Sequence, residues 1–431
     1  MQTVNSTQAV TAYRPLGAGE QIFWLHDQAH PVHFVLTAQI RGSFSVEQLT
    51  QALTLVQQRH PLLRVRIALD QAEQPWFVED SACIPLRVMH RQSEQHWQQE
   101  VEQEIATSFI WSQAPLIRVV LVHASNDAEL SELIVTCHHS IADGISGTYL
   151  MRDILQAITT PATFGESLPI PPALEDLVLG KAPKTIALPK PIPKLLSDSF
   201  PVVQRAKQNN HSFVSSDSLS LETTLSFISR CRQEQTSVHA AICAAFLLAV
   251  RQQNYSEQPQ NIICGSPISL RPYVTSVNQE DVSFCITGGR TSHRLSPNNN
   301  LWDVARSVKH QLNQSIVPDK LFEQIFQNQE WLTTHPSPDA VFHAFEDQLG
   351  YDIAVSNLKR LTIPQKFGEL ELQAVYGPVV TLGIKNDCLV GVATLGERLF
   401  FTLVCSELVM SRSQSKTLLE EATHLLKQAI E

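Results

Sequence analysis

The sequence lacks an excess of positive charge and a long apolar run. Its 431 residues carry 32 Lys and Arg against 42 Asp and Glu, a formal net charge of -10. Because proteins that read nucleic acid need a basic surface, nucleic acid is not an expected partner. The longest apolar run, Ala240 to Val250, is too short to cross a bilayer and predicts a buried helix. The first residues show no basic start followed by an apolar stretch, so we expect no signal peptide, no transmembrane segment and a cytoplasmic location.

The sequence also lacks paired cysteine motifs. It has eight cysteines and no C-x-x-C pair, and most of the cysteines lie in apolar runs. This pattern is typical of buried free thiols in a reducing cytosol rather than of a disulfide framework. The residues concerned are Cys83, Cys137, Cys231, Cys243, Cys264, Cys285, Cys388 and Cys405.

Prolines divide the chain near its middle. Nine of them fall between Pro161 and Pro201, and proline both fixes φ and removes a backbone donor. We therefore predict a semi-rigid linker without regular elements over 161–210, between domains at 1–160 and 211–431. The linker holds Lys181, Lys184, Lys190 and Lys194 with no acid between Asp176 and Asp198. These lysines are candidates to bind an anionic partner, or else they form a solvated face.

Both halves mix helical and strand patterns. Ser45 and Gln48 form a predicted capping box at the start of a helix. Further periodicity predicts mixed elements in each half, and hence two α/β sandwich domains. Helices are expected at 45–60, 145–158, 236–253, 302–316 and 418–430, and strands at 63–67, 116–123, 132–138 and 261–269, with several more in 369–404 around a turn at 396–398.

One short motif carries candidate chemistry: His138-His139-Ser140-Ile141-Ala142-Asp143-Gly144. Successive strand side chains point to opposite faces, so the two histidines cannot easily share one role. His139 ends an apolar strand beside a turn and is placed like a catalytic base, with an ordinary pKa near neutrality. The alternatives are two structural histidines, a metal site with Asp143, or a nucleophilic pair with Cys137. Adjacent histidines splay apart, which disfavours a metal site, and a thiol inside an apolar strand is usually inert.

The motif resembles HHxxxDG of the CoA-dependent acyltransferases related to chloramphenicol acetyltransferase. That superfamily includes condensation domains of non-ribosomal peptide synthetases, plant alcohol acyltransferases and polyketide-associated (Pap-type) acyltransferases. Further segments resemble it in chain order across nearly the whole length. They are Arg14-Pro15-Leu16 through Glu20 and Trp24, Arg59-His60-Pro61-Leu62-Leu63-Arg64, Pro267 through Leu270-Arg271-Pro272, and Val355-Ser356-Asn357-Leu358.

The resemblance implies two chloramphenicol-acetyltransferase-like domains in a V shape with a tunnel at their interface. It implies that His139 is the general base for transfer from a coenzyme A or phosphopantetheinyl carrier thioester, without a metal or a tightly bound cofactor. His138, Asp143 and Gly144 would be structural. Asp143 would pair with an arginine, for which Arg64 is the better candidate and Arg271 the second. Ser356 and Asn357 would lie near the tunnel.

The sequence lacks some motifs of the superfamily, and these differences favour one of its subgroups. The DFGWG motif of plant enzymes is absent, and Ser283 to Arg290 lacks the asparagine of the later condensation motif. No carrier-protein serine motif is visible. Pro171 to Asp176 resembles the Pap-type subgroup, so a stand-alone, ester-forming monomer acting on a small-molecule or lipid alcohol is expected, with an acyl carrier protein as a possible partner. An amide-forming transferase and a catalytically silent binding module are the alternatives.

Overall fold

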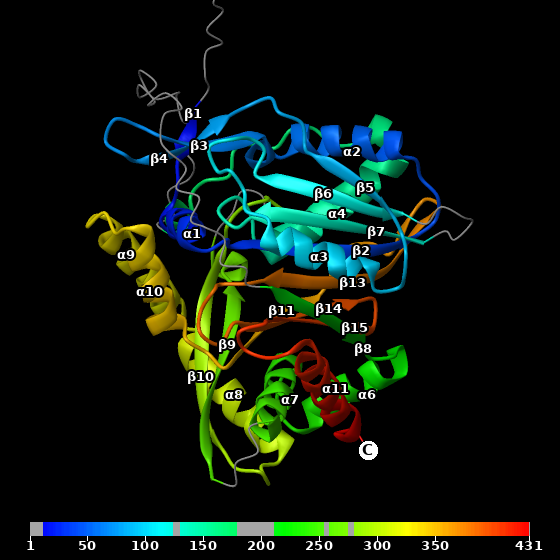
Figure 1. The fold of residues 1–431 in the computed structure, drawn as a ribbon, viewed down its shortest axis with the longest axis vertical. Helices are drawn as coiled ribbons and strands as arrows, with labels where there is room; N and C mark the ends of the chain where they lie inside the picture. Colours follow the sequence, from blue (N-terminus) through cyan, green and yellow to red (C-terminus); the bar gives the residue numbers. More distant parts are fainter. Residues whose placement is uncertain (1–11, 124–129, 179–210, 254–257, 275–279, 431) are drawn as a thin grey trace, which may run out of the picture.

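Two six-stranded sheets organise the protein (Figure 1). The first sheet takes four strands from the first half of the chain and two from the later half, and the second sheet comes entirely from the later half. The structure is a computed structural model, and it describes residues 12–123, 130–178, 211–253, 258–274 and 280–430. Helices cover both sheets, which confirms the predicted fold of two chloramphenicol-acetyltransferase-like α/β sandwiches.

The first sheet carries the motif strand at its centre. Its strand order is β12 (Lys366–Phe367), β13 (Leu370–Val380), β2 (His33–Arg41), β7 (Leu130–His138), β6 (Ile117–His123) and β5 (Leu86–His90). Thr136 on β7 faces α3 (His96–Ala106), where its hydroxyl donates to Glu104. The opposite face lies against α4 (Gly144–Thr159), because Gly147 packs on Phe34 and Leu36 of β2. Helix α2 (Val46–Arg59) packs beside α4.

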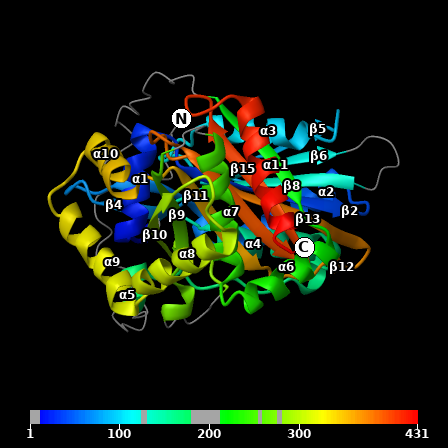
Figure 2. The same ribbon diagram turned by 90° about the horizontal axis from the view of Figure 1, so that it is seen from below.

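The second sheet has the order β10 (Ile286–Leu295), β9 (Gln260–Ser269), β11 (Ile353–Arg360), β14 (Cys388–Leu395), β15 (Arg398–Ser406) and β8 (Ser212–Ser218). The buried helix α7 (Val238–Gln253), predicted from its apolar run, packs against this sheet. Its neighbours in the same core are α6 (Leu221–Gln233), α8 (Leu301–Ser315) and α11 (Arg412–Gln428). Figure 2 shows these helices together on the outer side of the second sheet.

Smaller elements complete the structure. A three-stranded sheet has the order β1 (Ala12–Pro15), β4 (Pro75–Glu79) and β3 (Val65–Leu69). Helix α1 (Ala18–Ala29) packs against two helices that the sequence reasoning missed, α9 (Pro318–Leu332) and α10 (Pro338–Leu349). Short helices are η1 (Pro61–Arg64), η2 (Pro161–Thr163), α5 (Leu174–Val178) and η3 (Arg271–Tyr273).

Local predictions were mostly confirmed. The capping box of α2 is present, since Ser45 Oγ accepts from Gln48 N at 3.2 Å and Gln48 Oε1 accepts from Ser45 N at 2.8 Å. The turn at 396–398 joins β14 to β15, which pair from Leu395 to Arg398 onward. The predicted strand at 63–67 was wrong at its start, because Pro61 begins a 3₁₀ turn that runs to Arg64. The last helix begins at Arg412 rather than at 418.

The predicted linker is more structured than its prolines indicate. Within 161–178 the chain forms η2 and α5, and Arg14 Nε donates to Pro171 O at 2.8 Å. The prediction of no regular element was therefore wrong for this part, because side chains of the first half anchor it. Residues 179–210, with the four linker lysines, lie outside the described residues. The domain boundaries stay a prediction, although β12 and β13 of the later half complete the first sheet.

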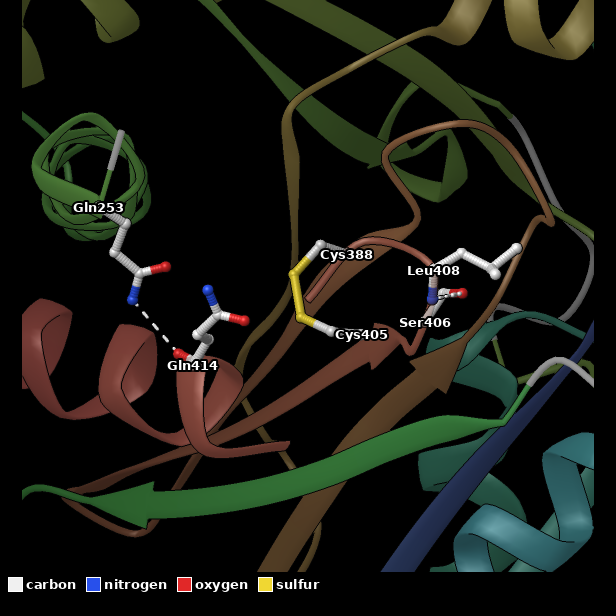
Figure 3. The surroundings of a disulfide bond; sticks show 6 residues. All are labelled: Gln253, Cys388, Cys405, Ser406, Leu408 and Gln414. Carbon is white, nitrogen blue, oxygen red and sulfur yellow. Dashed lines mark hydrogen bonds between the residues drawn. A yellow bond between two sulfur atoms is a disulfide. The ribbon is translucent and has the colours of Figure 1, made fainter. Parts of the chain in front are cut away.

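The prediction of eight free thiols was wrong for two of them. Cys388 and Cys405 form a disulfide (Figure 3). The antiparallel register of β14 and β15 places them directly opposite each other, with Cα atoms 4.3 Å apart. Sequence spacing hides this pairing because the hairpin separates the two residues by 17 positions. The six other cysteines are free, and all of these except Cys83 are buried.

Across the described ranges, we find no helix with the length and hydropathy needed to span a membrane.

Candidate active site

His139 lies just past the end of β7, in a cage of aromatic side chains. Its ring centroid is 4.5 Å from that of Phe23, 5.3 Å from Phe34 and 6.0 Å from Phe284. The residue is only 5% exposed. Its Nδ1 is buried and has no hydrogen-bond partner among the described residues. The cage combines α1 and β2 of the first half with the segment before β10 of the second.

Burial sets the protonation of His139. Removal from water lowers the pKa of His139 from 6.5 to about 4, and the nearby Asp143 charge and backbone groups oppose this only in part. At neutral pH the imidazole is therefore uncharged. A neutral imidazole can accept a proton, which is the first requirement of a general base.

A cavity of about 880 Å³ runs between the two halves and includes His139 in its wall. The first half contributes residues of α1, β2 and α4, and the second half contributes residues of β9, β10, β11 and the helices α8 to α10. The structure therefore places the motif histidine in an interface cavity, as the resemblance implied. Ser356 and Asn357 of β11 line the same cavity.

His138 has a different environment from its neighbour. It is fully buried on the α3 face, where Nδ1 accepts from Ser140 N at 3.1 Å and lies 2.8 Å from Ser140 Oγ. This bond leaves the ring proton on Nε2, which is 3.5 Å from Asp27 Oδ2 at the end of α1. His138 therefore braces the turn against α1, and it does not line the cavity.

Asp143 links the two halves. It is fully buried and caps α4, with Oδ1 accepting from Ser146 N at 2.7 Å. Arg271 Nη2 donates to both carboxylate oxygens, at 3.0 and 3.1 Å, and Cys285 N donates to Oδ2 at 3.1 Å. The carboxylate thus holds three partners, two of them from the second half.

Arg64 is not the partner of Asp143, so the preferred candidate was wrong. Its guanidinium donates to the carbonyls of Gln57 and Gln58 at the end of α2, and to Glu79 Oε1 at 3.1 Å. The 3₁₀ turn after Pro61 directs Arg64 back to that helix end. The preceding Arg59 and His60 instead hold Asp153 of α4, at 3.3 and 2.8 Å.

Glycine is needed at position 144 because side chains of two strands lie very close to the position that a Cβ would occupy. A Cβ at this position would lie 2.9 Å from Leu358 Cδ2 of β11 and 3.4 Å from Pro378 Cγ of β13. Gly144 also lines the cavity. The motif glycine therefore lets the start of α4 contact strands of the later half beside His139.

Sequence reasoning missed a second polar group in the cavity wall. His239 of α7 and Ser266 of β9 both line the cavity, and His239 Nε2 lies 3.0 Å from Ser266 Oγ. Burial alone would lower the pKa of His239, but Cys243 Sγ at 3.5 Å raises it above its ordinary value. The sequence did not identify these residues, because no motif includes them and the apolar sequence of α7 predicts only a buried helix.

Within the described part of the chain, no group of three or more His, Cys, Asp or Glu side chains is placed to hold a metal ion.

The model of the Condensation domain matches residues 21–174, and that of the Phthiocerol/phthiodiolone dimycocerosyl transferase C-terminus matches residues 212–376. The first part of the chain is therefore similar to condensation domains, and the later part is similar to the C-terminal part of that transferase.

Solved structures support this fold over the whole chain. Polyketide synthase associated protein 5 from Mycobacterium tuberculosis superposes with a TM-score of 0.66 at 17% identity, over 98% of this chain and 99% of that one. Trichothecene 15-O-acetyltransferase from Fusarium sporotrichioides gives a TM-score of 0.70 at 12% identity, over 100% and 98%.

Curated relatives match only part of the chain. A polyketide synthase-nonribosomal peptide synthetase from Pyricularia grisea is 26% identical over 167 residues, which are 36% of this chain and 4% of the relative. The chain spans only 3–4% of the length of the first such relatives.

Proposed function

We propose that the protein transfers an acyl group from a thioester donor, acyl-CoA or an acyl carrier protein, to a hydroxyl acceptor. The observation that carries this proposal is the position of His139, whose ring is uncharged at neutral pH and lies in the wall of the interface cavity. A thioester and an acceptor that meet in this cavity would both lie beside an imidazole that is free to accept a proton.

His139 would act twice in one cycle. Nε2 removes the proton from the acceptor hydroxyl as the oxygen attacks the thioester carbonyl. The tetrahedral intermediate collapses with cleavage of the C–S bond, and His139 returns the proton to the leaving thiolate. Developing charge on the carbonyl oxygen needs a donor. β11 places Ser356 and Asn357 in the cavity wall, and one of the two would be this donor because successive strand side chains point to opposite faces.

Basic side chains in the second half support a donor that carries phosphate. Arg290, Lys309, Lys359 and Arg360 all line the cavity. Lys359 adopts a left-handed φ of 62°, and its backbone N donates to Asn357 Oδ1 at 2.7 Å. Coenzyme A and the phosphopantetheine arm of a carrier protein share the anionic group that such residues bind.

A hydroxyl acceptor is favoured over an amine by the later half of the chain. This half matches the model named Phthiocerol/phthiodiolone dimycocerosyl transferase C-terminus, and a trichothecene 15-O-acetyltransferase shares the fold. The matches to peptide synthetases support amide formation as the second candidate.

The test is thiol release from a panel of acyl-CoAs with alcohols and amines, for the parent and His139→Ala. The parent is expected to turn over with alcohols, and the variant to lose about 100- to 10,000-fold in kcat. Faster turnover with amines would select the second candidate. Equal turnover of parent and variant would refute the role of His139.

A further inference from the structure

Apolar side chains line part of the cavity wall near His139. The ring of Phe23 is 4.5 Å from that of His139 and 5.6 Å from that of Phe345 of α10, between centroids. Leu349 follows Phe345 by one helical turn, and Trp331 of α9 lines the same cavity. We call the part of the cavity bounded by Phe23, Ile286, Gly288, Trp331, Phe345 and Leu349 the apolar arm.

Strand β10 forms the wall opposite α10. Alternate residues share a face, so Ile286, Gly288 and Arg290 follow one another along the arm, and all three line the cavity. At its outer end Arg290 Nη1 donates to Gln348 O at 2.9 Å, which ties β10 to the end of α10. The two elements therefore face each other across the arm.

Gly288 is an exposed residue of this wall that faces Leu349. A Cβ built there would approach Leu349 Cδ2 to 3.2 Å and meets no other atom within 4 Å. Its φ is not left-handed, so the backbone itself does not demand glycine. What the glycine provides is space between β10 and Leu349, and a larger side chain would occupy that space.

We propose that the apolar arm binds an aliphatic chain of the substrate and that Gly288 sets the width available to it. This rests on the proposed function for the chemistry, but the binding itself does not depend on turnover. The arm starts beside His139, so a chain attached to a reacting carbonyl or hydroxyl at Nε2 can extend into it. A saturated chain is the ligand that a wall of aromatic and aliphatic side chains accepts.

The first experiment measures chain-length selectivity in Gly288→Val, with Ser292→Val as the matched control. Ser292 is an exposed residue of the same strand and is not part of the cavity wall. Acyl-CoAs of two to sixteen carbons are paired with one short alcohol, and alcohols of the same lengths are paired with acetyl-CoA. The readout is the ratio of kcat/KM for long over short chains.

Gly288→Val is expected to lower this ratio by about 10- to 200-fold in one series, and Ser292→Val to leave it unchanged. A fall in the donor series places the acyl chain in the arm, and a fall in the alcohol series places the acceptor chain there. An unchanged ratio in both series overturns the proposal.

The second experiment separates this proposal from the proposed function. Titration with 11-bromo-1-undecanol is expected to quench tryptophan fluorescence saturably, through Trp331. Trp331→Phe removes that component, and Gly288→Val weakens the apparent Kd at least about 10-fold. If Gly288→Val and the parent bind 11-bromo-1-undecanol with equal apparent Kd, the proposal that the apolar arm binds an aliphatic chain is overturned. If no donor and acceptor pair releases thiol while this quenching is observed, the proposed function fails and the arm stands.

Discussion

The two halves of the protein contribute different parts of the site. The first half supplies His139 and the motif around it, because the residues from His138 to Gly144 connect the end of β7 to the start of α4. The second half supplies Arg271, which holds Asp143, and most of the cavity wall. The difference shows that a sequence motif can be local while the cavity that it lines is assembled from distant segments.

The largest expected effect on folding comes from breaking the contact between the halves. Asp143→Ala would leave Arg271 without its buried carboxylate and would remove the N-cap of α4. Loss of one partner of a buried pair typically costs about 3–5 kcal/mol of unfolding free energy. Urea unfolding followed by circular dichroism measures this cost. A loss below about 1 kcal/mol would mean that Asp143 does not join the halves.

A loss of folding stability is expected in acid. Burial lowers the pKa of His26, His33 and His139 to about 4 each, below the ordinary 6.5 of an unfolded chain. As pH falls from 6.5 towards 4, the unfolded state binds protons that the folded state does not, so stability present above pH 6.5 is lost. Each pKa unit corresponds to roughly 1.4 kcal/mol, so the loss should reach several kcal/mol.

Unfolding in urea at pH 7.5, 6.0 and 5.0 measures this loss. In His33→Gln, the free energy of unfolding should fall less steeply between pH 7.5 and pH 5.0 than it does in the parent. A free energy of unfolding that is constant down to pH 5 would contradict neutral buried histidines.

The smallest effects are expected where contacts stay within the first half. Arg64 and Glu79 form a partly exposed pair, and Ser45 caps α2 at the surface. Arg64→Ala and Ser45→Ala should each cost about 1 kcal/mol or less. Comparing their unfolding free energies with that of Asp143→Ala shows whether a large loss of stability requires a contact between the two halves. A loss in Arg64→Ala as large as that in Asp143→Ala would remove the distinction.

The same contrast explains what could be predicted from the sequence. The helices and strands with strong periodicity, the capping box and the position of His139 at the end of a strand followed from local patterns. The partner of Asp143 did not, because Arg64 and Arg271 both follow family-like motifs and only the folded chain shows that Arg64 turns back to α2. The cavity wall on α9 and α10 was also missed, because Trp331, Phe345 and Leu349 are ordinary apolar residues until the fold brings them near Phe23. The disulfide needed the register of β14 and β15, which spacing does not reveal.

The central claim is that His139, and not its neighbour, is the base. The most direct test compares kcat for thiol release in His139→Gln and His138→Gln, both verified as folded by circular dichroism. The account predicts a fall of about 100- to 10,000-fold for His139→Gln and a fall of less than about 10-fold for His138→Gln. The reverse order, or equal losses in the two folded variants, would contradict it.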